Sequence, residues 1–148
     1  MTNLSDPWWV PFKRVSSYTF GKNIGTIDRF RDDHIPCDSD NDHYTDEFLS
    51  FNPAGNKDVL ISTFDECIYS VTFWKEFYIG GDNFIGTPRV IFVEKLNSTF
   101  NNVDCVRSSD AIEFDDGDIY SEYYVGSLGL EFTVNIDDVI VYISAGDE

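Results

Sequence analysis

The stretch CIYSVTFWKEFYI (residues 67–79) is the longest segment of the chain with β-strand character. Its odd-numbered positions from Tyr69 to Ile79 are apolar, with Lys75 as the one exception. The even-numbered positions mix polar and apolar residues. Because side chains alternate between the two faces of a strand, this pattern predicts one continuous strand with its odd-numbered face on the core.

The next residues, YIGGDNFIGTP (78–88), predict a change from strand to helix. Glycines end the strand, Thr87 is expected to cap a helix, and Pro88 suits the first helical position. The helix is expected over residues 88–100, with these residues turned inward: Val90, Val93 and Leu96, with Ile91 and Phe100 as further candidates. Phe84 and Ile85 are expected to pack back onto its first turn, as a hydrophobic staple does.

Shorter segments on both sides also have strand character. Strands are expected at residues 14–21, 47–51, 58–64, on either side of the DDGD turn at 115–118, and in a C-terminal hairpin over 128–146. One or two helical turns are expected over 26–35, followed by an acidic loop. Together these patterns predict an α+β fold, with a mostly antiparallel β-sheet of about seven or eight strands and one or two helices packed on one face.

The 148 residues predict a single globular domain spanning residues 1–148. Residues 1–13 are expected to form an extended N-terminal arm, because Pro7 and Pro11 disfavour a helix. The tryptophans at 8 and 9 are expected to cover part of the core; the alternative is an exposed aromatic anchor for a partner.

The charge of the chain limits its partners. Lys and Arg total 10 against 27 Asp and Glu, which gives a formal net charge of -17. Nucleic-acid binding and anionic membrane surfaces both require basic residues, so we expect neither. A basic protein partner suits this charge, because opposite charges speed association.

The sequence predicts a cytoplasmic location. The three cysteines include no CxxC pair, so they predict no disulfide framework. The N-terminus has no basic region followed by an apolar run, and no stretch approaches the length of a membrane span. The oligomeric state is left open.

We expect no catalytic, metal or cofactor site. Asp38, Asp40 and Asp42 match the first half of a calcium loop, but His43 and Leu49 stand where its turn glycine and bidentate glutamate belong. A zinc site from His34, Cys37 and His43 lacks a nearby fourth ligand. A Cys–His nucleophile built on Cys37 stays open, because spacing in sequence does not decide it. Pairs of acids occur throughout this acidic chain and do not by themselves indicate a hydrolase.

Two segments resemble one family. GGDNFIGTPRVIFVEKL (80–96) and GLEFTVNIDDVIVYIS (129–144) resemble segments of small bacterial proteins encoded beside toxins. The resemblance implies an immunity protein of the kind found in contact-dependent and polymorphic toxin systems. Such a protein binds one cognate toxin domain, often a nuclease, and neutralises it. No catalytic residue carries over.

We therefore expect the chain to be a binding protein and not an enzyme, with acidic patches that mask a basic toxin surface. The expected contact residues are Asp38, Asp40, Asp42, Asp46 and Glu47, with a second patch of Asp115, Asp116 and Asp118. The alternatives are a module that binds a small ligand or a divalent metal, and an uncharacterised hydrolase.

Overall fold

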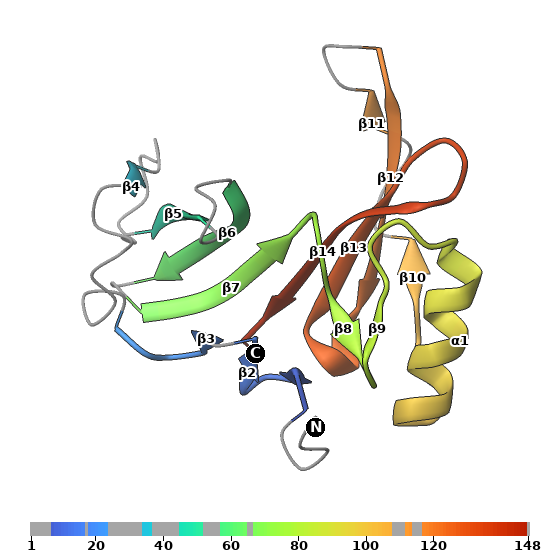
Figure 1. The fold of residues 1–148 in the computed structure, drawn as a ribbon, viewed down its shortest axis with the longest axis horizontal. Helices are drawn as coiled ribbons and strands as arrows, with labels where there is room; N and C mark the ends of the chain where they lie inside the picture. The colour runs from blue at the N-terminus through green and yellow to red at the C-terminus, as the bar shows by residue number, and fades with distance from the viewer. Residues whose placement is uncertain are drawn as a thin grey trace.

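The computed structural model describes residues 7–16, 18–23, 34–36, 45–51, 57–64, 67–107, 112–113 and 117–147, with backbone alone at 34–36, 45–51, 57–58 and 112–113. A nine-stranded sheet dominates this part of the chain, in the order β10-β12-β13-β14-β7-β6-β5-β4, with β11 also paired to β12 (Figure 1). Its strands are β4 (His34–Pro36), β5 (Thr45–Phe51), β6 (Lys57–Phe64), β7 (Cys67–Phe73), β10 (Val106–Arg107), β11 (Ile112–Glu113), β12 (Ile119–Val125), β13 (Leu130–Val134) and β14 (Ile140–Gly146).

Two small sheets and one helix complete the described fold. They are β1 (Trp9–Val10), β2 (Arg14–Val15) and β3 (Tyr18–Thr19); β8 (Tyr78–Ile79) and β9 (Asp82–Asn83); and α1 (Arg89–Phe100). All the strand pairs are antiparallel. The predicted α+β class, with an antiparallel sheet and a helix on one face, is confirmed. The strands outnumber the prediction, because several expected strands are divided.

The stretch 67–79 is two strands and not one. β7 ends at Phe73, and the Asn83 side chain then binds the backbone that would have continued the strand. Its Oδ1 accepts from the amide of Phe77 at 2.9 Å, and its Nδ2 donates to the carbonyl of Lys75 at 3.2 Å. A side chain that binds nearby backbone competes with a β-ladder in this way. The chain therefore turns into the β8–β9 hairpin.

A β-bulge explains why the predicted core face of residues 67–79 was wrong at one end. Ser62 pairs with Ser70, but Thr63 pairs with Ile68, so Tyr69 is an extra residue in β7. Ile68 is buried in place of Tyr69, which is 41% exposed.

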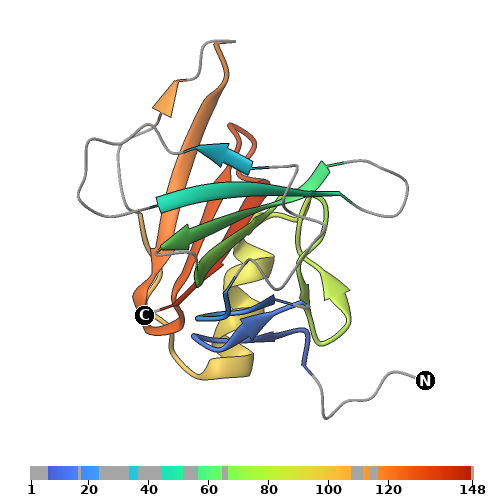
Figure 2. The same cartoon turned by 90° about the vertical axis from the view of Figure 1, so that its left-hand side faces the viewer.

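Bulges of the same kind occur in two other strand pairs among the described residues. In the β13–β14 hairpin Val141 is the extra residue, so Ile140 and Ile143 are both buried although their numbers differ in parity. A third irregularity lies between β5 and β6. Bulges increase the local twist of a sheet, and Figure 2 shows β5 and β6 running across the direction of β12.

The helix α1 lies against one side of the sheet, and Phe92 anchors it there. Phe92 is fully buried, and its ring lies 5.1 Å from Phe132 of β13, 5.3 Å from Phe84 and 6.4 Å from Phe77. The predicted packing of Phe84 onto the helix is confirmed: it is buried, and it contacts the fourth helical residue. Ile85 is partly buried against the same core.

The inward face of α1 differs from the prediction. Phe92 and Leu96 are fully buried, and Val93 and Phe100 pack partly against the core, whereas Val90 is 50% and Ile91 47% exposed. Pro88, and not Thr87, occupies the N-cap position. The Thr87 hydroxyl donates to the carbonyl of Phe84 at 2.8 Å and so ties this residue to the turn before the helix. The helix starts one residue later than predicted. Its buried face is centred on Phe92 and Leu96, and Val90 is not part of it.

The N-terminal segment folds back on itself. The strand expected over 14–21 is a hairpin, β2–β3, with Ser16 at a positive φ of 54° in its turn. The predicted core role of the tryptophans is confirmed: Trp9 is 5% exposed, and Trp8 packs against Phe73 and Phe77. Of the helical turns expected over 26–35, residues 26–33 lie outside the described residues. At His34 and Ile35 the prediction was wrong, because both belong to strand β4.

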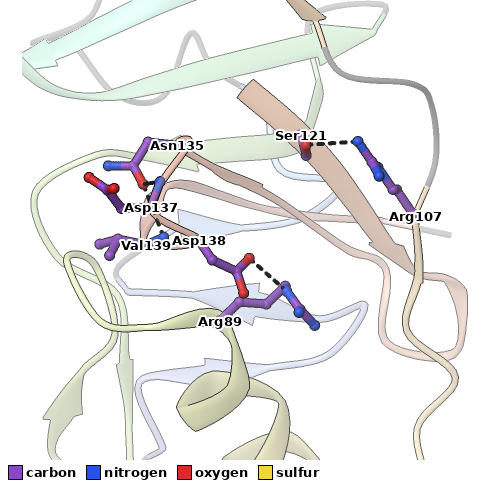
Figure 3. Close-up of polar contacts among 7 residues, drawn as sticks. All are labelled: Arg89, Arg107, Ser121, Asn135, Asp137, Asp138 and Val139. Carbon is purple, nitrogen blue, oxygen red and sulfur yellow. Dashed lines mark hydrogen bonds and ion pairs between the residues drawn. The ribbon is translucent and has the colours of Figure 1, made fainter. Parts of the chain in front are cut away.

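The turn between β13 and β14 fastens the sheet to the start of the helix (Figure 3). Asn135 Oδ1 accepts hydrogen bonds from the amides of Asp137 at 3.0 Å and Val139 at 3.1 Å. Arg89 Nε then donates to Asp138 Oδ1 at 2.8 Å, and the Arg89 amide donates to the Asp138 carbonyl at 2.9 Å. This pairing raises the pKa of the Arg89 guanidinium. The turn is therefore a fixed joint between the hairpin and α1.

Replacing the anchor of the helix should destabilise the whole fold. We expect Phe92→Ala to lower the free energy of unfolding by about 3–5 kcal/mol, the usual loss for a large aromatic residue removed from a core. Ile91→Ala, on the exposed side of the same helix, should change it by about 0.5 kcal/mol or less. Urea unfolding of both variants tests this. Equal losses would show that Phe92 is not the anchor.

Removing the side chain that closes the β13–β14 turn should also destabilise the protein. Asn135→Ala leaves two backbone amides without their acceptor, so we expect a loss of about 1–3 kcal/mol in the free energy of unfolding. Asn135→Asp keeps an acceptor oxygen and should retain most of that stability in high salt, which screens the added charge. An Asp variant as unstable as the Ala variant would contradict this explanation.

Candidate functional site

The large sheet has two faces of different character. Phe132 contacts α1, and Tyr123 stacks on Phe132 at 5.3 Å with the Arg89 guanidinium 4.9 Å from its ring centroid. These residues therefore face the helix. Since side chains alternate along a strand, Glu122, Tyr124 and Glu131 face the other way. We call this second surface the open face.

The open face is built from alternate positions of four neighbouring strands. Its residues are Glu122 and Tyr124 on β12, Glu131 and Thr133 on β13, Tyr142 and Ser144 on β14, and Ser70 and Thr72 on β7, with the bulged Tyr69 beside them. The strand register places Tyr124, Glu131, Ser144 and Thr72 in one row across the sheet. Glu122, Thr133 and Tyr142 form the adjacent row.

Hydroxyl groups link the middle of the open face. Ser144 Oγ accepts a hydrogen bond from Thr72 Oγ1 at 3.0 Å and lies 3.0 Å from Ser70 Oγ. These contacts join β14 to β7 through side chains as well as through the backbone. The floor of the open face is therefore polar and held in place on both sides.

Two hollows lie side by side over this floor. One, of about 390 Å³, is bounded by Tyr69 and Tyr124, and the other, of about 240 Å³, is bounded by Glu122 and Tyr142. Glu131 and Ser144 line both, so the hollows adjoin. The surface offers shallow recesses between exposed aromatic rings instead of one deep pocket.

The open face is acidic and rich in tyrosine. The lining includes the carboxylates of Glu122, Glu131 and Asp147, and none of the described residues that line it is basic. Tyr124 is 44% and Tyr142 40% exposed. Arg107 on the neighbouring strand β10 donates to Ser121 on the helix side at 3.1 Å (Figure 3). Carboxylates and tyrosine rings together attract cationic groups, through charge and through cation–π contacts.

The structure describes only part of the acidic patches that the sequence predicts. Asp38, Asp40, Asp42, Asp115 and Asp116 lie outside the described residues. Asp46 and Glu47 are on β5, where the backbone pairs them with Thr63 and Ser62. Asp118 is exposed just before β12, and the Tyr120 hydroxyl donates to its Oδ2 at 3.5 Å. Their role in partner binding remains a prediction.

The sequence reasoning did not select the residues of the open face. The signal was present in the polar positions that alternate with buried ones along residues 119–125 and 130–134. The sequence prediction instead selected acids that lie close together along the chain, in segments with loop-like composition. Glu122 and Glu131 stand alone in sequence, and only strand pairing brings them together.

The described residues hold no cluster of three or more potential metal ligands, and no helix among them is long and apolar enough to cross a membrane. Cys37 and His43 lie outside this part of the chain. Cys105, between α1 and β10, is half-buried, and burial raises the pKa of its thiol while the Arg89 guanidinium lowers it in part. A thiol held neutral is a weak nucleophile.

The raised pKa of Cys105 predicts slow alkylation and a loss of stability in base. Iodoacetamide should label Cys105 at pH 8 more slowly in the folded protein than in urea, as followed by peptide mapping. As pH rises, the unfolded thiol ionises first, so its contribution to stability is complete below the unfolded pKa and declines above it. Cys105→Ser should reduce this alkaline loss. Labelling at equal rates in both states would contradict the neutral-thiol assignment.

Comparison with known proteins adds no relative to this description. No family model, no curated protein and no solved structure matches the chain.

Proposed function

We propose that this chain is an immunity protein that neutralises a toxin domain by covering its basic surface. The observation that carries the proposal is the open face, where carboxylates and exposed tyrosines lie together and no described lining residue is basic. The net charge of -17 means that the molecule as a whole also attracts basic proteins. The proposal also rests on the resemblance of residues 80–96 and 129–144 to immunity proteins.

The chemistry of the open face suits tight association with a basic protein. Tyrosine carries much of the binding energy in many interfaces, because it buries a large rigid ring and still offers a hydroxyl. The carboxylates provide long-range attraction to Lys and Arg, which raises the association rate. A nuclease presents such residues where it holds phosphates. Covering them would block its substrate without any chemistry by the inhibitor.

The acids predicted from the sequence extend this proposal beyond the open face. Asp118 lies at the β11–β12 hairpin, which projects from the body of the sheet (Figure 1). The patch from Asp38 to Glu47 and the patch from Asp115 to Asp118 would then add contacts at the margins of the interface. Action in the cytoplasm, against one cognate toxin, is part of the same proposal.

The first test is co-purification with the C-terminal domain encoded immediately upstream of this chain's gene. We expect a stoichiometric complex, and rescue of growth when that domain is expressed. Its affinity should fall as salt rises, because screening removes the long-range attraction. Absence of both a complex and rescue would overturn the proposal.

Point variants then locate the interface. Tyr124→Ala should weaken the complex by about 1–2 kcal/mol, or about tenfold or more in Kd. Glu131→Gln should lower the association rate several-fold and flatten its salt dependence. Glu94→Gln, which removes the same charge from the exposed side of α1, is the matched control and should bind as the wild type does.

The predicted loops are tested in the same assay with Asp40→Asn and Asp116→Asn. We expect smaller effects on the association rate than that of Glu131→Gln, since we place these acids at the margins. A complex that forms normally with Tyr124→Ala and Glu131→Gln would show that the toxin binds another surface.

A further inference from the structure

The larger hollow of the open face lies between Tyr69 and Tyr124, over residues with little or no side chain. Gly146 of β14 pairs with Ser70 of β7, and the Gly146 amide donates to the carbonyl of Gly129 at 2.8 Å. All three short residues line the hollow, so the two tyrosines bound a low floor. We call this hollow of about 390 Å³ the tyrosine recess.

A carboxylate and an aromatic ring are direct neighbours in the tyrosine recess. The strand register places Glu131 of β13 opposite Tyr124 of β12. Side chains paired in this way have Cβ atoms about 4.5–5.5 Å apart, so one ligand can contact both. Both side chains are exposed, and the Tyr124 ring lies close to Gly126. Within the part of the chain that the structure describes, no basic residue lines this recess.

The helix side of the same strand shows which group such a pair of side chains can bind. There the Arg89 guanidinium lies 4.9 Å from the ring centroid of Tyr123, the residue before Tyr124. Arg89 Nε also donates to Asp138 Oδ1 at 2.8 Å (Figure 3). A guanidinium can do both at once, because its plane stacks on a ring while its N–H groups bind a carboxylate. On the open face the corresponding ring and carboxylate are those of Tyr124 and Glu131, and no described residue places a guanidinium there.

We propose that the tyrosine recess takes an arginine side chain of the basic partner, stacked on Tyr124 and paired with Glu131. This proposal rests on the function proposed above for the open face, and it names the group that this face recognises. Lysine suits the recess less well, because its ammonium group is more strongly hydrated and does not stack on a ring. The recess extends from β12 to β7, about 14 Å across three strand spacings, so a long side chain can lie along it.

Three peptides of one design test the ligand chemistry without the toxin. They are acetyl-Gly-X-Gly-amide with arginine, lysine or citrulline at X; lysine keeps the charge of arginine, and citrulline keeps its shape without the charge. Titrations followed by the backbone amide NMR signals of Glu131 and Gly146 should give a Kd about three- to tenfold lower for the arginine peptide than for the lysine peptide. The citrulline peptide should bind at least about tenfold more weakly than the arginine peptide. Equal affinities for arginine and lysine, or no binding of the arginine peptide, would overturn the proposal.

Variants of the two contact residues assign a role to each. Tyr124→Leu should raise the Kd of the arginine peptide to that of the lysine peptide, because the ring provides the preference for arginine. Glu131→Gln should weaken both peptides several-fold, because each has lost the same counter-charge. Glu94→Gln removes one charge from the exposed side of α1, and it should bind both peptides as the wild type does. The NMR spectrum of each variant shows directly whether it is folded.

A second tyrosine variant locates the guanidinium on the open face. Tyr142 is 40% exposed, close to the 44% of Tyr124, but it lines only the adjoining hollow. Tyr142→Leu should therefore keep the preference for arginine over lysine. A preference that is lost in Tyr142→Leu and kept in Tyr124→Leu would place the guanidinium in the adjoining hollow, and the proposal would be wrong.

Failure of arginine recognition and failure of the immunity function give different results. A preference for arginine that depends on Tyr124, without any toxin complex, would support the arginine site and overturn only the immunity function. A toxin complex that forms normally, with no preference between the arginine and lysine peptides, would support immunity and overturn the arginine site.

Discussion

The contact between Phe92 of α1 and Phe132 of β13 determines which way the sheet faces. Once the helix covers one side, every alternate residue on β12, β13 and β14 must point to the other. The rings of Phe77, Phe84 and Tyr123 extend this contact into a continuous aromatic layer. The helix, the β8–β9 hairpin and the sheet are therefore joined through one set of side chains, while the open face is left for polar residues.

That division leaves the open face free for recognition. It combines carboxylates with tyrosines over a hydroxyl-bonded floor, which suits a cationic protein surface. The proposed immunity function needs no chemistry from the chain.

Sequence reasoning predicted the fold class and much of the core. The predicted C-terminal hairpin over 128–146 is present as β13 and β14, and its alternating apolar residues Leu130, Phe132 and Val134 are buried. The predicted core face of residues 67–79 was wrong where Tyr69 is added to the strand, since a bulge has no sequence pattern of its own. The helix face was misread because Phe92, and not Val90, meets Phe132 of β13, a contact that only the tertiary structure decides.

The candidate site was harder to predict, for a physical reason. The sequence shows acids that are neighbours along the chain, but Glu122 and Glu131 become neighbours only through the register of β12 with β13. The prediction therefore selected acids in loop-like segments, and most of these acids lie outside the described residues. The tryptophans were expected to cover part of the core, and both do.

The strands beside β12 have a consequence for how this protein meets other chains. β10 pairs only with Tyr123 and Tyr124, and β11 only with Ile119 and Tyr120, so two short strands occupy one edge in succession. Among the described residues, Ser121 and Glu122 are the stretch of β12 between these two partners, and two residues are too few to template another strand. Short edge strands of this kind disfavour edge-to-edge association. Recognition here must therefore depend on side chains, which can distinguish one partner from another, whereas exposed backbone would accept any extended chain.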